Sequence, residues 1–202
     1  MAERGEQRRI RATLEVEQED LIHNDLGNAA HYLTERVRER LANGDRDGLF
    51  LEMIAAVTMT AFSLEANLNF VGEEAVSGWV ERQRTRDKLP IICKTLGLAP
   101  DWSKRPYLTV DALFSLRDQL AHGKPRRSKT REVVVGTHDE LTARARAAME
   151  SGWADALTPE FVAEAYEDVE SIWQDLLKAA KIDVVETMSG GGSSVDFLGY
   201  EN

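Results

Sequence analysis

The sequence has little cysteine and no long apolar run free of charges. Cys93 is the only cysteine among 202 residues, which excludes an intrachain disulfide and every metal site built from several cysteines. The most apolar stretch, residues 53–64, holds twelve residues without a charge, short of the ~20 residues that cross a bilayer. Residues 1–9 are mostly polar and charged and lack the apolar segment of a secretory signal. We therefore expect a cytoplasmic protein with no metal and no membrane contact.

Basic residues are outnumbered, with 25 Lys and Arg against 35 Asp and Glu, so the formal net charge is −10. This balance argues against a general nucleic-acid coat, because phosphate binding is driven by clustered lysine and arginine. Any RNA contact must then be local, and one segment has five basic residues within eight positions: Lys124, Arg126, Arg127, Lys129 and Arg131. Two interpretations stay open at this point, a patch that binds RNA and a solvated loop whose charges only aid solubility.

The chain divides into one core region and two tails. Its length and its apolar content of 43% are sufficient for one buried core. Residues 1–17 are expected to form a flexible or weakly helical arm, and the Ser- and Gly-rich segment 189–202 a flexible tail. The region between them, 18–188, is predicted to be a single helical domain.

Apolar residues in this region recur at helical spacing, which predicts an all-α bundle. The predicted helices cover residues 20–41, 47–70, 73–86, 87–97, 110–122 and 158–181. Gly72 is expected to close the second helix, and Trp102 to pack against the core from a loop. The three β-branched residues at 133–135 predict one short β-strand or hairpin near residues 131–136.

The helix predicted over residues 110–122 carries an arginine in an unusual place. On a helical wheel, Arg117 falls in the middle of an apolar stripe made by Val110, Leu113, Phe114, Leu120 and Ala121. A guanidinium turned toward apolar surroundings keeps its charge, so it needs a carboxylate, a phosphate or a subunit boundary. Glu65 on the second helix can pair with it, with Asn69 one turn further on as a second support residue. A half-exposed Glu65 at a helix boundary is the alternative.

His122 lies at the predicted end of the same helix. Gly123 can take the left-handed position after the helix and Pro125 forbids continuation, so the imidazole is free to move and the helix dipole favours its protonated form. Asp118 shares the face of His122 and is close enough to orient the ring. Arg117 and His122 are about 140° apart around a regular helix, so either the helix distorts or two copies meet across a two-fold axis.

The segment Arg117-Asp118-Gln119-Leu120-Ala121-His122-Gly123 resembles the R-x4-6-H signature of HEPN domains. In layout the resemblance covers the region from about Gly44 to Lys181. It implies a compact dimeric helical bundle and, in many members of the family, RNA cleavage that needs no metal or other cofactor. His122 would then act on the ribose 2′-hydroxyl or the leaving oxygen, Arg117 would stabilise charge on the phosphate, and Asp118 would assist as a polar helper.

The function that this resemblance implies is a metal-independent endoribonuclease, such as a toxin or phage-defence component with an antitoxin or defence partner protein. Lys124 stands where some members of the family carry the tyrosine of R-x4-H-x-Tyr, which argues against a nucleotidyltransferase antitoxin. The alternative is a catalytically silent HEPN-like module that dimerises, binds a partner protein or binds RNA without cutting it. His23, His31 and His138 lack the spacing of metal ligands and are expected on the surface or at helix caps.

Overall fold

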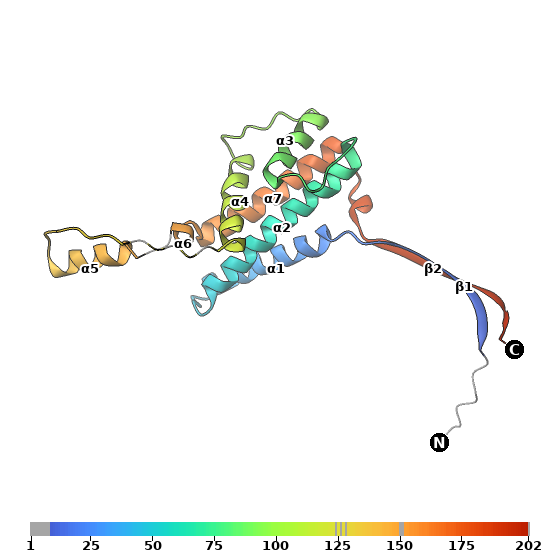
Figure 1. Ribbon diagram of the computed structural model, residues 1–202, viewed down its shortest axis with the longest axis horizontal. Helices are drawn as coiled ribbons and strands as arrows, with labels where there is room; N and C mark the ends of the chain where they lie inside the picture. Colours follow the sequence, from blue (N-terminus) through green and yellow to red (C-terminus); the bar gives the residue numbers. More distant parts are fainter. Residues whose placement is uncertain (1–8, 124, 126, 128, 150–151, 202) are drawn as a thin grey trace, which may run out of the picture.

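The fold is known from a computed structural model that describes residues 9–123, 125, 127, 129–149 and 152–201. Its helices gather into one body, from which two segments project at opposite ends (Figure 1). One projection is a long two-stranded ribbon that holds both ends of the described chain, and the other contains α5 (His138–Ala147). The predicted helical character is confirmed, and a small antiparallel sheet is added to it.

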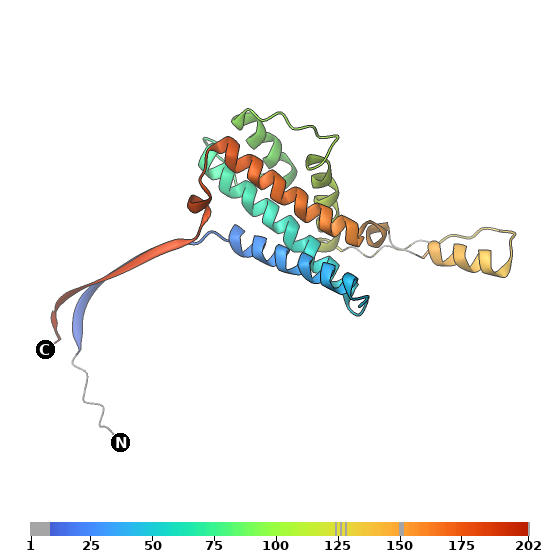
Figure 2. The same cartoon turned by 180° about the vertical axis from the view of Figure 1, so that it is seen from behind.

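The body is built around one central helix. α2 (Leu49–Ala75) packs against α1 (His23–Ala42), α3 (Thr85–Leu96), α4 (Tyr107–Ala121) and α7 (Pro159–Ala180). Figure 2 shows α1, α2 and α7 as long neighbouring helices. The core between the helices consists of apolar side chains that are at most 1% exposed, among them Val57, Leu64, Leu68, Leu89, Ile92, Leu113, Phe114 and Ile172.

By length and composition, α2 is long and apolar enough to cross a membrane, and it is the one such helix in the part of the chain that the structure describes. The charge-free run at residues 53–64 is shorter than the apolar part of α2, because few charged residues lie in the helix on either side of that run. The core helix of a folded body meets the same criterion, and α2 has that position here, in contact with α1, α3, α4 and α7.

The helix predicted over residues 73–86 is not present. α2 continues through Gly72 to Ala75, and residues 76–84 form turns and bends before α3 begins. Gly72 is buried inside the helix because the Trp79 ring packs directly on it: an added Cβ would lie 2.3 Å from Trp79 Cε2. The glycine that was expected to end the helix is therefore a packing site for the returning chain.

The strand predicted near residues 131–136 is also wrong. Residues 129–137 have no regular structure, and Val133 and Val135 are fully exposed. A β-branched run forms a strand only with a partner, and no other described segment pairs with this one. The chain continues instead into α5, which begins with a capping box between Thr137 and Glu140, and into the short helix α6 (Gly152–Ala156).

Strands occur instead in the two segments expected to be tails. β1 (Ile10–Glu19) pairs antiparallel with β2 (Gly190–Tyr200), with Leu14 opposite Val195 and a bulge between Arg11 and Ala12. Apolar and polar residues alternate along residues 12–17, which is the period of a strand and not of a helix. The glycines that indicated flexibility allow close backbone approach, since a Cβ on Gly191 would lie 2.8 Å from the Glu17 carbonyl oxygen.

Candidate functional site

An ion-paired cluster on three helices surrounds Arg117. The Arg117 guanidinium donates from Nη2 to Glu65 Oε2 at 3.0 Å, so the pair expected between α2 and α4 is present. Glu65 Oε1 accepts hydrogen bonds from the Thr85 hydroxyl at 2.8 Å and from Lys88 Nζ at 3.2 Å, both on α3. One carboxylate thus joins α2, α3 and α4.

Lys88 is the charge of this cluster that sequence analysis missed. Its side chain is 2% exposed, and its ammonium also donates to Asn69 Oδ1 at 2.7 Å. Asn69 therefore supports Lys88 and not Arg117. The signal was available, because Lys88 lies four residues before the buried Ile92 and so on the inward side of α3. A buried ammonium is tolerated only where such partners satisfy it.

The Arg117 side chain is 17% exposed and has partners on several sides. Nη1 forms an ion pair with Asp118 Oδ1 at 3.1 Å, and the guanidinium carbon lies 5.6 Å from the centroid of the Phe114 ring. Nε is buried and has no hydrogen-bond partner among the described residues. The arginine in the apolar stripe is therefore satisfied by carboxylates within one chain, with one donor left over.

A cleft opens beside Arg117 at the start of α3. Its volume is about 390 Å³ and it is lined by Arg84, Thr85, Arg86, Phe114, Arg117 and Asp118. The first turn of α3 has no side-chain cap, so the positive end of the helix dipole lies at the edge of this cleft. Arg86 is held there by Asp111 at 3.1 Å and by the Ser115 hydroxyl at 2.7 Å. The lining holds three guanidinium groups and one carboxylate, and Asp111 and Glu65 from outside the lining pair with Arg86 and Arg117.

His122 does not line this cleft. It is the exposed C-cap residue of α4, and its backbone N–H donates to the Asp118 carbonyl at 2.9 Å. Its imidazole has no hydrogen bond or ion pair with any described residue. Asp118 is paired with Arg117, so the expected orientation of His122 by the Asp118 carboxylate is not observed. Within one chain, His122 is therefore not among the residues that line the Arg117 cleft.

The basic segment after α4 is only partly described. Lys124 and Arg126 lie outside the described residues, whereas Arg127, Lys129 and Arg131 are exposed along the connection to α5. Glu132 next to them pairs with Arg144 of α5 at 3.0 Å. The described cations are thus accessible to a polyanion, and they begin within a few residues of His122.

A second hollow of about 220 Å³ lies between α1, α2 and α7, and polar side chains line most of it. His31 Nδ1 and the Tyr166 hydroxyl are 3.1 Å apart there. Burial raises the pKa of the Glu170 carboxyl, an effect that His31 opposes. His23, which was expected on the surface or at a helix cap, is the first residue of α1. It is buried against the Phe70 and Trp173 rings, 3.1 Å from the Thr187 carbonyl oxygen. These contacts make the ring a packing residue, and burial lowers the pKa of its imidazole.

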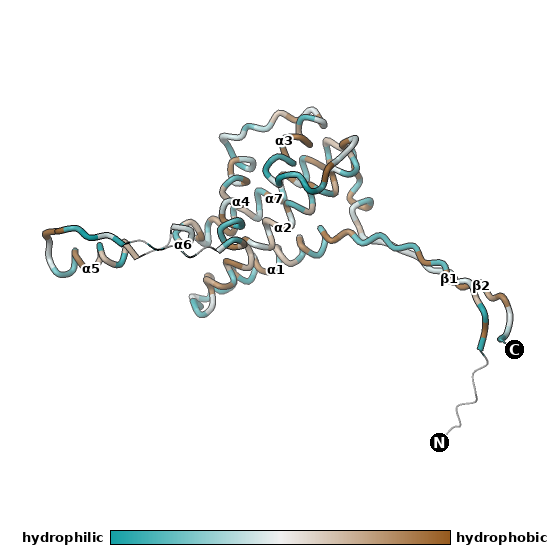
Figure 3. Tube along the Cα trace, viewed as in Figure 1, coloured by the Kyte–Doolittle hydropathy of each residue, from teal (hydrophilic) through white to brown (hydrophobic). Residues whose placement is uncertain are grey.

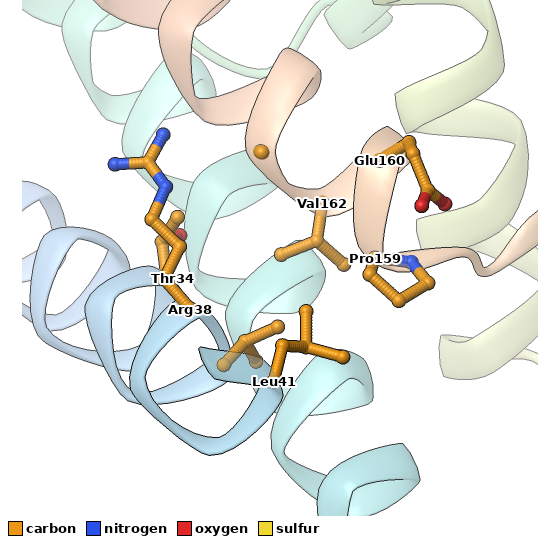
Figure 4. Close-up of a pocket in the computed structure, with 8 residues that line it drawn as sticks. Thr34, Arg38, Leu41, Pro159, Glu160 and Val162 are labelled. Carbon is orange, nitrogen blue, oxygen red and sulfur yellow. The ribbon is translucent and has the colours of Figure 1, made fainter. Parts of the chain in front are cut away.

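Figure 4 shows a smaller hollow of about 180 Å³ between α1 and the start of α7. Its labelled lining residues are Thr34, Arg38, Leu41, Pro159, Glu160 and Val162. Arg38 is paired with Glu35 and with Glu167. The lining is mainly apolar and holds no nucleophile next to a base, so we assign this hollow to helix packing.

Trp102 and Cys93, which the sequence also pointed out, do not contribute to the cleft. Trp102 was expected against the core, but it is 45% exposed and packs edge-on to Tyr107 with ring centroids 5.6 Å apart. Burial raises the pKa of the Cys93 thiol to about 11, which leaves it uncharged and inert at neutral pH. No group of three or more His, Cys, Asp or Glu side chains within the described ranges could hold a metal ion.

The fold and the site define a helical body with an arginine-lined cleft at the junction of α3 and α4. Comparison with known proteins finds no matching protein family, no matching curated protein and no matching solved structure.

Proposed function

We propose that this protein is a metal-independent endoribonuclease of the HEPN type that acts in the cytoplasm as a toxin or phage-defence component. The observation that carries the proposal is the cleft around Arg117, which gathers three guanidinium groups at an uncapped helix start. The exposed imidazole of His122 lies at the end of the same helix as Arg117. These are the two side chains of the R-x4-6-H signature.

The cleft is suited to a phosphate of the RNA backbone. Arginine binds phosphate through paired N–H donors, and a helix N-terminus favours an anion. The net charge of −10 limits binding elsewhere on the surface, because polyanion affinity follows local clusters of cations. The exposed Arg127, Lys129 and Arg131 would extend the contact along the strand.

The proposed reaction is an attack of the ribose 2′-oxygen on the adjacent phosphorus, which breaks the bond to the 5′-oxygen. His122 would take the proton from the 2′-hydroxyl or give one to the leaving oxygen, and Arg117 would stabilise charge on the phosphate oxygens. Because the two side chains of one chain do not share a cleft, His122 would come from a second copy. Asp118 would hold the Arg117 guanidinium in position, as the ion pair between them indicates.

The test is cleavage of labelled single-stranded RNA, in the presence of a chelator, by the wild-type protein and by His122→Ala. The expected result is a loss of at least about 100-fold in rate, the lower end of what a general acid or base contributes. His138→Ala is the matched control, because His138 is also exposed and at a helix end. A wild-type protein that cuts no RNA, or an equally active His122→Ala, would overturn the proposal.

A second candidate is supported by the ion pairs themselves. Glu65 and Asp118 already neutralise Arg117 inside one chain, which is also what a purely structural arginine would show. In that case the protein would be a partner-binding or dimerisation module. His122→Ala would then leave every property unchanged, and Arg117→Ala would lower the free energy of unfolding or separate the subunits.

A further inference from the structure

The ribbon of β1 and β2 has two very different faces. Residues directly opposite each other in an antiparallel pair point to the same side, so the register assigns each residue to a face. One face is apolar and holds Ile10, Ala12, Leu14, Val16, Val195 and Phe197. The other face is polar, with the carboxylates Glu15, Glu17, Glu19 and Asp196 and the guanidinium of Arg11. Figure 3 shows hydrophobic and hydrophilic residues together along the ribbon.

The apolar face is uncovered in the single chain. Its large side chains are 53–66% exposed, and the ribbon projects away from the helical body (Figures 1 and 2). A two-stranded ribbon by itself is marginally stable in water, and a contiguous exposed apolar patch marks an interaction site. No described residue of the body covers these side chains, so the ribbon needs a partner.

We propose that the partner is the same face of a second copy of this chain, so that two ribbons pack face to face across a two-fold axis. In this arrangement the two ribbons form two layers about 10 Å apart. The acidic face of each ribbon points away from the other ribbon, toward solvent. Pairing edge to edge would instead gather the carboxylates of both copies on one surface. None of the described residues on the apolar face is a cation, so this face does not attract RNA or an anionic membrane.

The shape of the apolar face fits an antiparallel arrangement of the two ribbons. Toward the tip the face is bulky, with Phe197 opposite Ala12 and with Ile10 beyond them. Toward the body it is thin, because Val16 lies opposite Ser193 and the strand ends in glycines. Antiparallel packing lays the bulky half of each ribbon over the thin half of the other. Leu14, at mid-length, then lies near its counterpart at the axis.

The size of the face predicts a moderate affinity. Ten residues of strand make a strip about 33 Å long and, with two strands, about 10 Å wide. This is smaller than the ~800 Å² per partner of a standard interface. We therefore expect an assembly that dissociates on dilution.

The first test is sedimentation velocity of the full chain over a wide range of concentration. The wild-type mass is expected to halve on dilution, and Leu14→Lys to show the halved mass throughout. Thr13→Lys is the matched control, because it adds the same charge one residue away on the outward face, opposite Asp196. A wild-type protein that is monomeric at every concentration, or an assembly that survives Leu14→Lys, would overturn the proposal.

The second test asks whether ribbon contacts ribbon. Leu14→Cys is expected to form a covalent dimer under mild oxidation, whereas Thr13→Cys is not. Buried Cys93, at 2% exposure, does not compete. An assembly that depends on Leu14 but gives no cross-link through Leu14→Cys would mean that the ribbon docks elsewhere, and the proposal would fail. The ribbon contains neither Arg117 nor His122, so the ribonuclease proposal is judged separately, by His122→Ala in a chain whose ribbon is unchanged.

Discussion

At the scale of single residues, Glu65 connects three side chains of the interior. It accepts from Thr85, Lys88 and Arg117, so two cations of the interior depend on one carboxylate. Arg117 has a second carboxylate in Asp118, whereas among the described residues Lys88 has only the neutral oxygen of Asn69 besides Glu65. Removal of the Glu65 charge therefore affects Lys88 most.

We predict that Glu65→Gln lowers the free energy of unfolding by about 3 kcal/mol, the cost of leaving one partner of a buried ion pair uncompensated. The measurement is urea-induced unfolding followed by circular dichroism in the far ultraviolet. Glu73→Gln is the control, because Glu73 is exposed on the same helix and surface changes stay within about 0.5 kcal/mol. Equal unfolding midpoints for the two variants would contradict the assigned role of Glu65.

At the scale of elements, two helical glycines have opposite environments. Gly72 of α2 lies under the Trp79 ring, where an added Cβ would be 2.3 Å from a ring carbon. Gly27 of α1 has only the Ser63 hydroxyl nearby, at an ordinary 3.6 Å. The same substitution should thus have opposite effects on stability.

Gly27→Ala is expected to raise the melting temperature, since alanine is favoured over glycine within a helix by about 1 kcal/mol. Gly72→Ala should lower it despite the same gain, because the Trp79 ring must leave its place. Differential scanning calorimetry of both variants measures the contrast. A stabilised Gly72→Ala would show that the turn at residues 76–84 does not pack as described.

The sequence predicted helices well where one face is apolar and the ends have caps. Thr158 and Pro159 marked the start of α7, and Gly97 marked the end of α3. The contact between Glu65 and Arg117 was one of two alternatives that the sequence left open for Glu65. The sequence did not predict β1, β2 or Lys88, because strand pairing between distant segments and the burial of a lysine depend on partners that spacing alone does not identify. That His122 reaches the Arg117 cleft of a second copy stays a prediction.

At the scale of the whole molecule, charge is distributed unevenly. The chain is acidic overall, yet Arg127, Lys129 and Arg131 follow α4 without an ion pair among the described residues. If they contact RNA, the affinity must depend on salt in proportion to the phosphates that they neutralise.

We predict that replacing Arg127, Lys129 and Arg131 together by alanine flattens the plot of log affinity against log salt concentration. The expected change is about 0.7 in slope for each lost contact with single-stranded RNA, measured by fluorescence anisotropy. The control replaces Arg82, Lys94 and Lys178, which are exposed on the body, by alanine. An identical change of slope in both triple variants would show that only net charge matters.

The ribbon joins the earliest and the latest parts of the described chain, and Arg9 and Glu201 at its tip form an ion pair at 2.9 Å. During synthesis, β1 leaves the ribosome long before β2 exists, so the whole helical body is made while β1 has no strand to pair with. Any assembly through the ribbon must therefore follow translation of the body. A nascent chain can dock its helices, but it cannot recruit a second copy in this way until residues 190–200 have emerged.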